Sequence, residues 1–100
     1  INAGGVKTDP AWIDELVSKI PGVIECATFA RYGTSGVPVV ACAVILESEL
    51  TDDALSAAIA LDLGAHAPRE WYRVESIPRT DMGKPRRGEL TERYSESLPD

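Results

Sequence analysis

Lys84 is the residue of this sequence whose type and setting are best suited to chemistry. It lies in a loop-like stretch between Pro78 and Arg87, where Gly83 before it frees the backbone and Pro85 after it favours an extended geometry. Four basic residues against one aspartate leave this stretch with three positive charges. The rest of the chain therefore carries nine negative charges, since the total is −6. A cationic loop on an acidic domain indicates an anionic ligand.

The residues around Lys84 follow the spacing Pro-Arg-Thr-x-x-Gly-Lys-x-x-Arg-x-x-Leu. This spacing resembles the last core motif of the adenylate-forming superfamily, which includes acyl-CoA synthetases, peptide-synthetase adenylation domains and luciferases. The matching positions are Pro78, Arg79, Thr80, Gly83, Lys84, Arg87 and Leu90. The resemblance implies that Lys84 is the catalytic lysine of adenylation, whereas a lone lysine would be only a solvated charge. It also implies a group of loop-shaping residues, namely Thr80, Gly83, Pro85 and Arg87.

Two positions depart from the motif. Pro85 stands where the superfamily usually has an aliphatic residue, and we expect it to begin a helix, because its missing N–H costs nothing there. Gly88 weakens the helix that follows. Neither change removes the lysine.

A second motif opens the chain. The Gly4-Gly5 pair allows a tight turn or a close approach of the backbone to a ligand. The pattern Gly-Gly-x-x-x-x-Pro-x-x-Ile-Asp resembles the start of the C-terminal domain of the same superfamily. In acyl-CoA synthetases this glycine-rich hairpin lines the channel for the pantetheine arm, which by resemblance points to Gly4, Gly5, Val6 and Lys7. Trp12 and Asp14 stand where the superfamily commonly has glutamates, so the acidic character is kept at Asp14 alone.

The remaining pattern predicts an α+β domain, with about three main strands flanked by helices and the glycine-rich hairpin at its N-terminus. Apolar periodicity predicts helices over 10–20, 52–63 and 86–94. Asp9 and Thr51 are the expected N-caps, and Gly64 is the expected stop of the second helix. Runs rich in β-branched and aromatic residues predict strands over 23–31, 38–46 and 71–74, the first two as a hairpin. Residues 95–100 read as a flexible tail.

Composition restricts the class of protein. The 100 residues suit one small domain, and the net charge of −6 argues against a general binder of nucleic acid or anionic membranes. The sequence has no apolar run of membrane-spanning length and no signal-peptide pattern. Cys26 and Cys42 lie in apolar runs and are expected to be buried reduced thiols of a cytoplasmic protein, with a disulfide as the alternative. His66 has no evident catalytic partner in the sequence. Because the sequence contains one histidine and no Cys/His cluster, we expect no zinc site built by the protein.

The resemblance implies a C-terminal lid domain of an AMP-forming acyl-CoA synthetase. In that family the ATP and acyl sites belong to a much larger N-terminal domain, which is the expected partner. The full-length enzyme would use ATP, Mg²⁺, CoA and a carboxylic acid. The lid would rotate, so that the lysine loop faces the active site in one half-reaction and the hairpin faces it in the other. Because the chain starts at Ile1 without methionine, we expect it to be a fragment, inactive and without a bound cofactor on its own.

Three other assignments stay open at this point. A peptide-synthetase adenylation domain would carry the same lysine and transfer its product to a carrier protein. A 2-succinylbenzoate-type CoA ligase of menaquinone synthesis is a possible subfamily. A non-catalytic α+β module could use the basic loop to bind phosphate. A serine/threonine/glycine-rich phosphate loop far upstream of Ile1 would favour the synthetases.

Overall fold

The computed structural model describes residues 1–3, 5–47, 49–96 and 98. Its elements confirm the predicted α+β class: a three-stranded sheet with three helices and a separate two-stranded hairpin. In chain order they are β1 (Asn2–Ala3), β2 (Val6–Lys7), α1 (Pro10–Val17), β3 (Val23–Tyr32), β4 (Pro38–Leu46), α2 (Asp52–Leu63), the 3₁₀ turn η1 (Gly64–His66), β5 (Glu70–Arg73) and α3 (Arg87–Tyr94).

The main sheet has the order β3-β4-β5, with β4 in the centre. β3 and β4 form the predicted antiparallel hairpin, whose register pairs Thr28 with Cys42. β5 runs parallel to β4, so α2 and η1 make the crossover between these two strands. The central part of β4, residues 40–44, is buried on both faces, as its continuous apolar run predicts.

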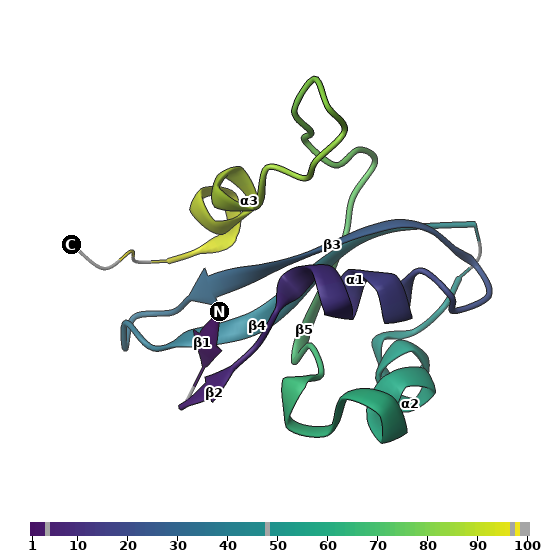
Figure 1. Ribbon diagram of the computed structural model, residues 1–100, viewed down its shortest axis with the longest axis horizontal. Coiled ribbons are helices and arrows are strands. Elements are labelled where there is room, and N and C mark those ends of the chain that lie inside the picture. Colours follow the sequence, from purple (N-terminus) through teal and green to yellow (C-terminus); the bar gives the residue numbers. More distant parts are fainter. Residues whose placement is uncertain (4, 48, 97, 99–100) are drawn as a thin grey trace.

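Side chains that alternate along the strands give the sheet two packed faces. One face packs against α1 and α2 through a cluster of ten buried residues, which are Ile13, Val17, Cys26, Val40, Cys42, Val44, Leu55, Ile59, Leu63 and Trp71. The opposite face packs against α3 and the segment before it, and its buried members are Ala27, Phe29, Ala41, Ala43, Ile77 and Leu90. Figure 1 shows the resulting layers, with α3 above the sheet, α2 below it, and α1 just beneath β3 on the side of α2.

The free edge of β3 is closed by groups from both layers. The Thr28 N–H donates to Asp14 Oδ1 of α1 at 2.6 Å, and the Thr28 carbonyl accepts from Arg87 Nη1 of α3 at 2.7 Å. Further along the edge, the Tyr32 N–H donates to the Ser95 hydroxyl, and the Tyr32 carbonyl accepts from the Glu96 N–H. An unpaired strand edge invites pairing with another chain, so these contacts protect β3 while joining the two helical layers.

The predicted helix over 10–20 is shorter in the structure. Asp9 caps it and Pro10 begins it as expected, but the α-helix ends at Val17. The chain then continues through Lys19 and Ile20, whose N–H groups bond three residues back instead of four. A proline disfavours the α region in the residue before it, so Pro21 already unwinds the last turn. Within the described ranges, the structure has no helix long and apolar enough to cross a membrane.

Both cysteines are buried free thiols, which confirms the sequence-based expectation. They lie on adjacent strands, and the Thr28 hydroxyl donates to Cys42 Sγ at 3.8 Å. The neighbouring Cys26 thiol and burial together raise the pKa of the Cys42 thiol well above its ordinary value. Since the thiolate is the reactive form of cysteine, Cys42 is a packing residue at neutral pH.

Candidate functional site: the Lys84 loop and the N-terminal hairpin

Lys84 lies at the end of a tight hairpin turn. The Thr80 N–H donates to the Lys84 carbonyl at 2.8 Å, and the Gly83 N–H donates to the Thr80 carbonyl at 2.9 Å. The Lys84 N–H in turn donates to the Thr80 hydroxyl at 3.1 Å. This pattern is that of a three-residue hairpin loop, whose last position requires a left-handed backbone. Gly83 occupies that position with φ of +86°, so it fixes the shape of the turn.

The turn presents the Lys84 side chain to solvent. Lys84 is exposed, and within the described part of the chain no hydrogen bond or ion pair engages its ammonium group. Figure 1 shows the segment between β5 and α3 rising away from the sheet as a projecting loop. The domain body therefore holds the backbone of this loop and leaves the lysine ammonium available to a ligand outside the domain.

The structure corrects the expected role of Pro85. Instead of beginning the helix, Pro85 forms an antiparallel bridge with Arg79 across the hairpin. The Arg86 N–H donates to the Pro78 carbonyl at 2.8 Å, which extends the stem of the hairpin by one more pair. α3 consequently begins at Arg87. The prediction failed because a proline before a helix and a proline in a strand-like stem look alike in sequence.

The base of the loop is anchored by Arg87 at the start of α3. Arg87 Nη1 lies 2.8 Å from Asp14 Oδ2 and also donates to the Thr28 carbonyl. The side chains of Arg87 and Asp14 are only 27% and 16% exposed. Partly buried charges paired in this way are costly to separate. Arg87 thus joins the foot of the Lys84 loop to α1 and β3.

We expect Arg87→Met to lower the free energy of unfolding by about 2 kcal/mol, because it leaves a half-buried carboxylate and a strand carbonyl without their donor. The matched control is Arg93→Met, which removes the exposed Glu89–Arg93 pair of the same helix. It should cost less than about 0.5 kcal/mol. Urea unfolding of both variants measures the difference. Equal losses would show that Arg87 is not an anchor.

The second candidate site is the β1–β2 hairpin. Its register pairs Ala3 with Val6, so the turn consists of two residues. Gly5 has φ of +85°, which confirms the predicted tight turn, and Gly4 lies outside the described residues. Val6 is half-buried, whereas Lys7 is exposed. A Cβ added at Gly5 would meet no atom within 4 Å, so this turn has open space around it.

His66 has a structural role in holding this hairpin. Its Nδ1 lies 2.9 Å from the hydroxyl of Thr8, the residue after β2. Its ring packs edge-on against Trp12, with the ring centroids 5.3 Å apart. His66 therefore connects η1 to the end of the hairpin. This contact could not be predicted from the sequence, because Thr8 lies 58 positions away from His66.

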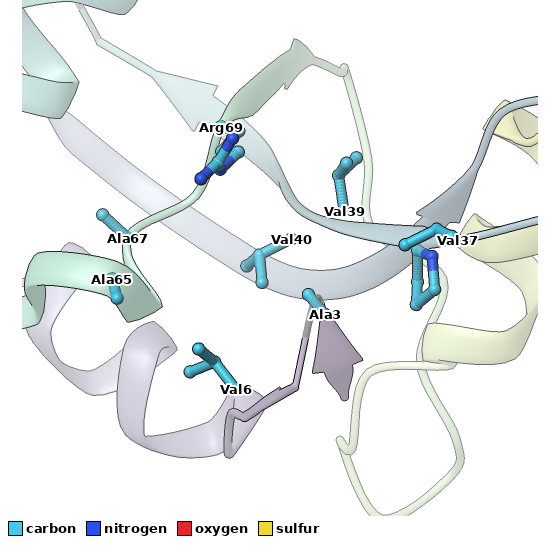
Figure 2. Close-up of a pocket in the computed structure, with 9 residues that line it drawn as sticks. Ala3, Val6, Val37, Val39, Val40, Ala65, Ala67 and Arg69 are labelled. Carbon is cyan, nitrogen blue, oxygen red and sulfur yellow. The ribbon is translucent and has the colours of Figure 1, made fainter. Parts of the chain in front are cut away.

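A pocket of about 250 Å³ opens beside the hairpin (Figure 2). Its lining residues are mostly apolar and come from the hairpin, the start of β4 and the connection to β5. The residues that line it are Ala3, Val6, Val37, Pro38, Val39, Val40, Ala65, Ala67 and Arg69. Arg69 adds a guanidinium group, which suits a phosphate or carboxylate. Sequence analysis did not single out Arg69, because only the parallel pairing of β5 with β4 brings it to the hairpin.

The predicted site residues thus fall into two separate clusters. The Lys84 loop projects on the α3 side of the sheet, whereas the β1–β2 hairpin lies on the side of α1 and α2 (Figure 1). No group of three or more metal-ligating side chains is found among the residues that the structure describes. The arrangement offers an exposed cation at Lys84 in one cluster and, in the other, a pocket lined mostly by apolar residues together with Arg69.

Comparisons with known proteins identify the family of this domain. A family model, "AMP-binding enzyme C-terminal domain", matches residues 13–84, well over half of the chain. A search of curated proteins found no match.

Solved structures match over almost the whole chain. A fatty acyl CoA synthetase of Mycobacterium tuberculosis is 27% identical with a TM-score of 0.86, over 99% of this chain and 20% of that chain. ATP-bound MatB from Rhodopseudomonas palustris is 22% identical with a TM-score of 0.83, over 94% and 19%. The o-succinylbenzoate CoA synthetase (MenE) of Bacillus subtilis, bound with a product analogue, is 20% identical with a TM-score of 0.84, over 94% and 20%. The chain spans about a fifth of the length of these proteins. It belongs to the family of AMP-binding enzyme C-terminal domains, within the adenylate-forming superfamily.

Proposed function

We propose that this chain is the C-terminal lid domain of a cytoplasmic AMP-forming acyl-CoA synthetase and that Lys84 is its adenylation lysine. The observation that carries the proposal is the Lys84 hairpin: a hydrogen-bonded backbone turn that projects a lysine whose ammonium has no partner in the described part of the domain. The partner that would receive this lysine is the larger N-terminal domain of the same enzyme. The carboxylic acid and Mg²⁺-bound ATP would bind there.

The first half-reaction explains why a lysine is suited to this place. A carboxylate oxygen forms a bond to the α-phosphorus of ATP, and the bond to the bridging oxygen breaks as pyrophosphate leaves with the electron pair. Negative charge builds up on the carboxylate and phosphate oxygens in the transition state. A long side chain with a compact ammonium can neutralise this charge at close range in a site that excludes water.

The second half-reaction uses the other cluster. The thiol of CoA attacks the acyl carbon, and AMP leaves with the electrons of the broken acyl–phosphate bond. We propose that the pocket beside Val6 forms part of the thiol channel. Most of its lining residues are apolar, which suits the pantetheine arm, and Arg69 would bind a phosphate of CoA. Because the two clusters lie on different sides of the sheet, a rotation of the lid would present them in turn.

The choice of acyl substrate is a separate question. The acyl pocket belongs to the proposed N-terminal domain, and the similarity to MenE is one of fold. A 2-succinylbenzoate-type ligase therefore stays a prediction. Thioester assays with free CoA and with a carrier protein would distinguish a CoA ligase from a peptide-synthetase domain.

We expect residues 1–100 alone to show ATP–pyrophosphate exchange at background with any carboxylic acid, because the proposed nucleotide site belongs to the N-terminal domain. The full-length enzyme should exchange with its own acid. The assay follows radiolabelled pyrophosphate entering ATP, with the full-length enzyme as the positive control. Robust exchange by residues 1–100 alone would overturn the lid assignment.

A further inference from the structure

We infer that Arg79 and Glu25 form a brace that positions the Lys84 backbone for adenylation. This inference rests on the proposed function of Lys84. Glu25 lies near the start of β3, outside both motifs, and Arg79 lies on the first strand of the Lys84 hairpin. Both act through Lys84, so they are positioning residues.

The guanidinium of Arg79 joins the loop to the sheet. Its Nη1 donates to the Gly83 carbonyl at 2.9 Å, while Nε and Nη2 donate to Glu25 Oε1 at 3.1 and 2.8 Å. The Gly83 carbonyl belongs to the peptide bond that links Gly83 to Lys84. One planar guanidinium thus connects this peptide bond directly to a carboxylate on β3, which restricts the direction in which the Lys84 side chain leaves the backbone.

The path of β3 at this point favours the brace. The register with β4 shifts between Val23 and Glu25, which leaves Ile24 as an extra residue in the strand. Such β-bulges bend a strand and redirect the neighbouring side chain. Glu25 then reaches the loop across a sequence separation of 54 residues. On the other rim of the hairpin, Arg86 Nε donates to the Arg79 carbonyl at 3.1 Å and fixes the backbone of the brace itself.

The brace also affects which positive charges of the loop can interact with an anionic ligand. Glu25 neutralises Arg79, and Asp14 neutralises Arg87. The ammonium of Lys84 has no carboxylate partner within the described ranges. Arg86 also lacks a carboxylate partner among the described residues, but its Nε donates to the Arg79 carbonyl. Lys84 is therefore the basic residue of the loop whose charged group makes no hydrogen bond within the described part of the domain.

The exposure of the brace argues for positioning over stability. The side chains of Arg79 and Glu25 are 32% and 43% exposed, and exposed ion pairs contribute little to folding. A displacement of reacting groups by 1 Å can nevertheless cost about 100-fold in rate. The brace should therefore affect adenylation much more than unfolding.

The test uses the full-length enzyme and measures each half-reaction by single-turnover kinetics. Glu25→Gln and Arg79→Met should each lower the adenylation rate about tenfold, short of the ~100-fold cost of a full 1 Å displacement. Thioester formation from supplied acyl-adenylate should stay within about threefold of wild type. Arg79→Lys should recover part of the rate, since it keeps the charge beside Glu25 without the fork that reaches the Gly83 carbonyl. Hydrogen exchange at the Gly83 and Lys84 amides should become faster in the Glu25→Gln and Arg79→Met variants.

Glu89→Gln is the matched control, because it breaks an ion pair within α3 whose side chains are 48% and 47% exposed. It should leave both half-reactions unchanged. Lys84→Ala in the same assay separates the two hypotheses. If Lys84→Ala lowers adenylation and the brace variants do not, the brace is wrong and the proposed function stands. If Lys84→Ala has no effect, the proposed function fails and the brace fails with it. Equal losses in both half-reactions would assign the brace to folding and overturn its positioning role.

Discussion

Replacing Lys84 by alanine in the full-length enzyme is expected to lower the adenylation rate by roughly 10² to 10³, the scale for losing one preorganised charge-stabilising group. The ammonium is exposed and without a partner in the described domain, so its removal should hardly change the free energy of unfolding. Thioester formation from supplied acyl-adenylate should be close to normal, because the role proposed for the lysine is confined to the step in which charge develops on phosphate.

Single-turnover kinetics of the two half-reactions provide the measurement. Lys19→Ala is the control, since Lys19 is another exposed lysine, placed after α1 and far along the chain from the loop. It should affect neither half-reaction. If Lys84→Ala leaves adenylation within about threefold of wild type, equivalent to under ~1 kcal/mol, Lys84 is not the catalytic lysine.

Acetylation of Lys84 should reproduce the alanine phenotype, because acetylation removes the positive charge. The Lys84 hairpin allows the effect of the lost charge to be separated from an effect on loop structure. Its hydrogen bonds involve the backbone of Lys84, and the side-chain nitrogen takes no part in them. Enzyme acetylated at Lys84 should therefore keep its loop structure and its thioester activity while adenylation falls. Loss of both activities would assign the modification a structural effect.

Replacing Gly5 by tryptophan is expected to lower thioester formation about 100-fold, the scale of a 1 Å misplacement of a reactant, while adenylation is largely retained. Gly5 stands at the turn of the β1–β2 hairpin, beside the pocket lined by Val6 and Arg69. Apart from the chain neighbours of Gly5, no described residue has an atom within 4 Å of a Cβ at this position, so the indole would extend into the space proposed for the pantetheine arm.

The positive φ at Gly5 requires a control for backbone strain. Gly5→Asn supplies it, because asparagine tolerates the left-handed region and adds little bulk. Asparagine should preserve most of the thioester activity, which would assign the tryptophan effect to obstruction. Supplied acyl-adenylate isolates the second half-reaction, and ATP–pyrophosphate exchange follows the first. A similar loss in both would give Gly5 a role in folding.

The sequence by itself determined the local elements and the family-level motifs. Asp9 and Thr51 cap helices because their side chains bond N–H groups two and three residues away. The apolar run over 38–46 formed the strand with those bounds. The motif around Lys84 led to the superfamily that the family model then established. Each of these signals depends on a few neighbouring residues or on a fixed spacing, so it can be recognised in the sequence before the tertiary structure is known.

Tertiary structure alone decided which side chains meet. Arg87 reaches Asp14 across 73 positions, and Arg79 reaches Glu25 across 54. Arg69 joins Val6 in one pocket because β5 runs parallel to the central strand β4. Pro85 entered the stem of a hairpin instead of a helix, because a backbone bridge to Arg79 outweighed its preference for a helix start. These outcomes depend on strand order, register and the path of the chain around the edge of β3, none of which is encoded in local spacing.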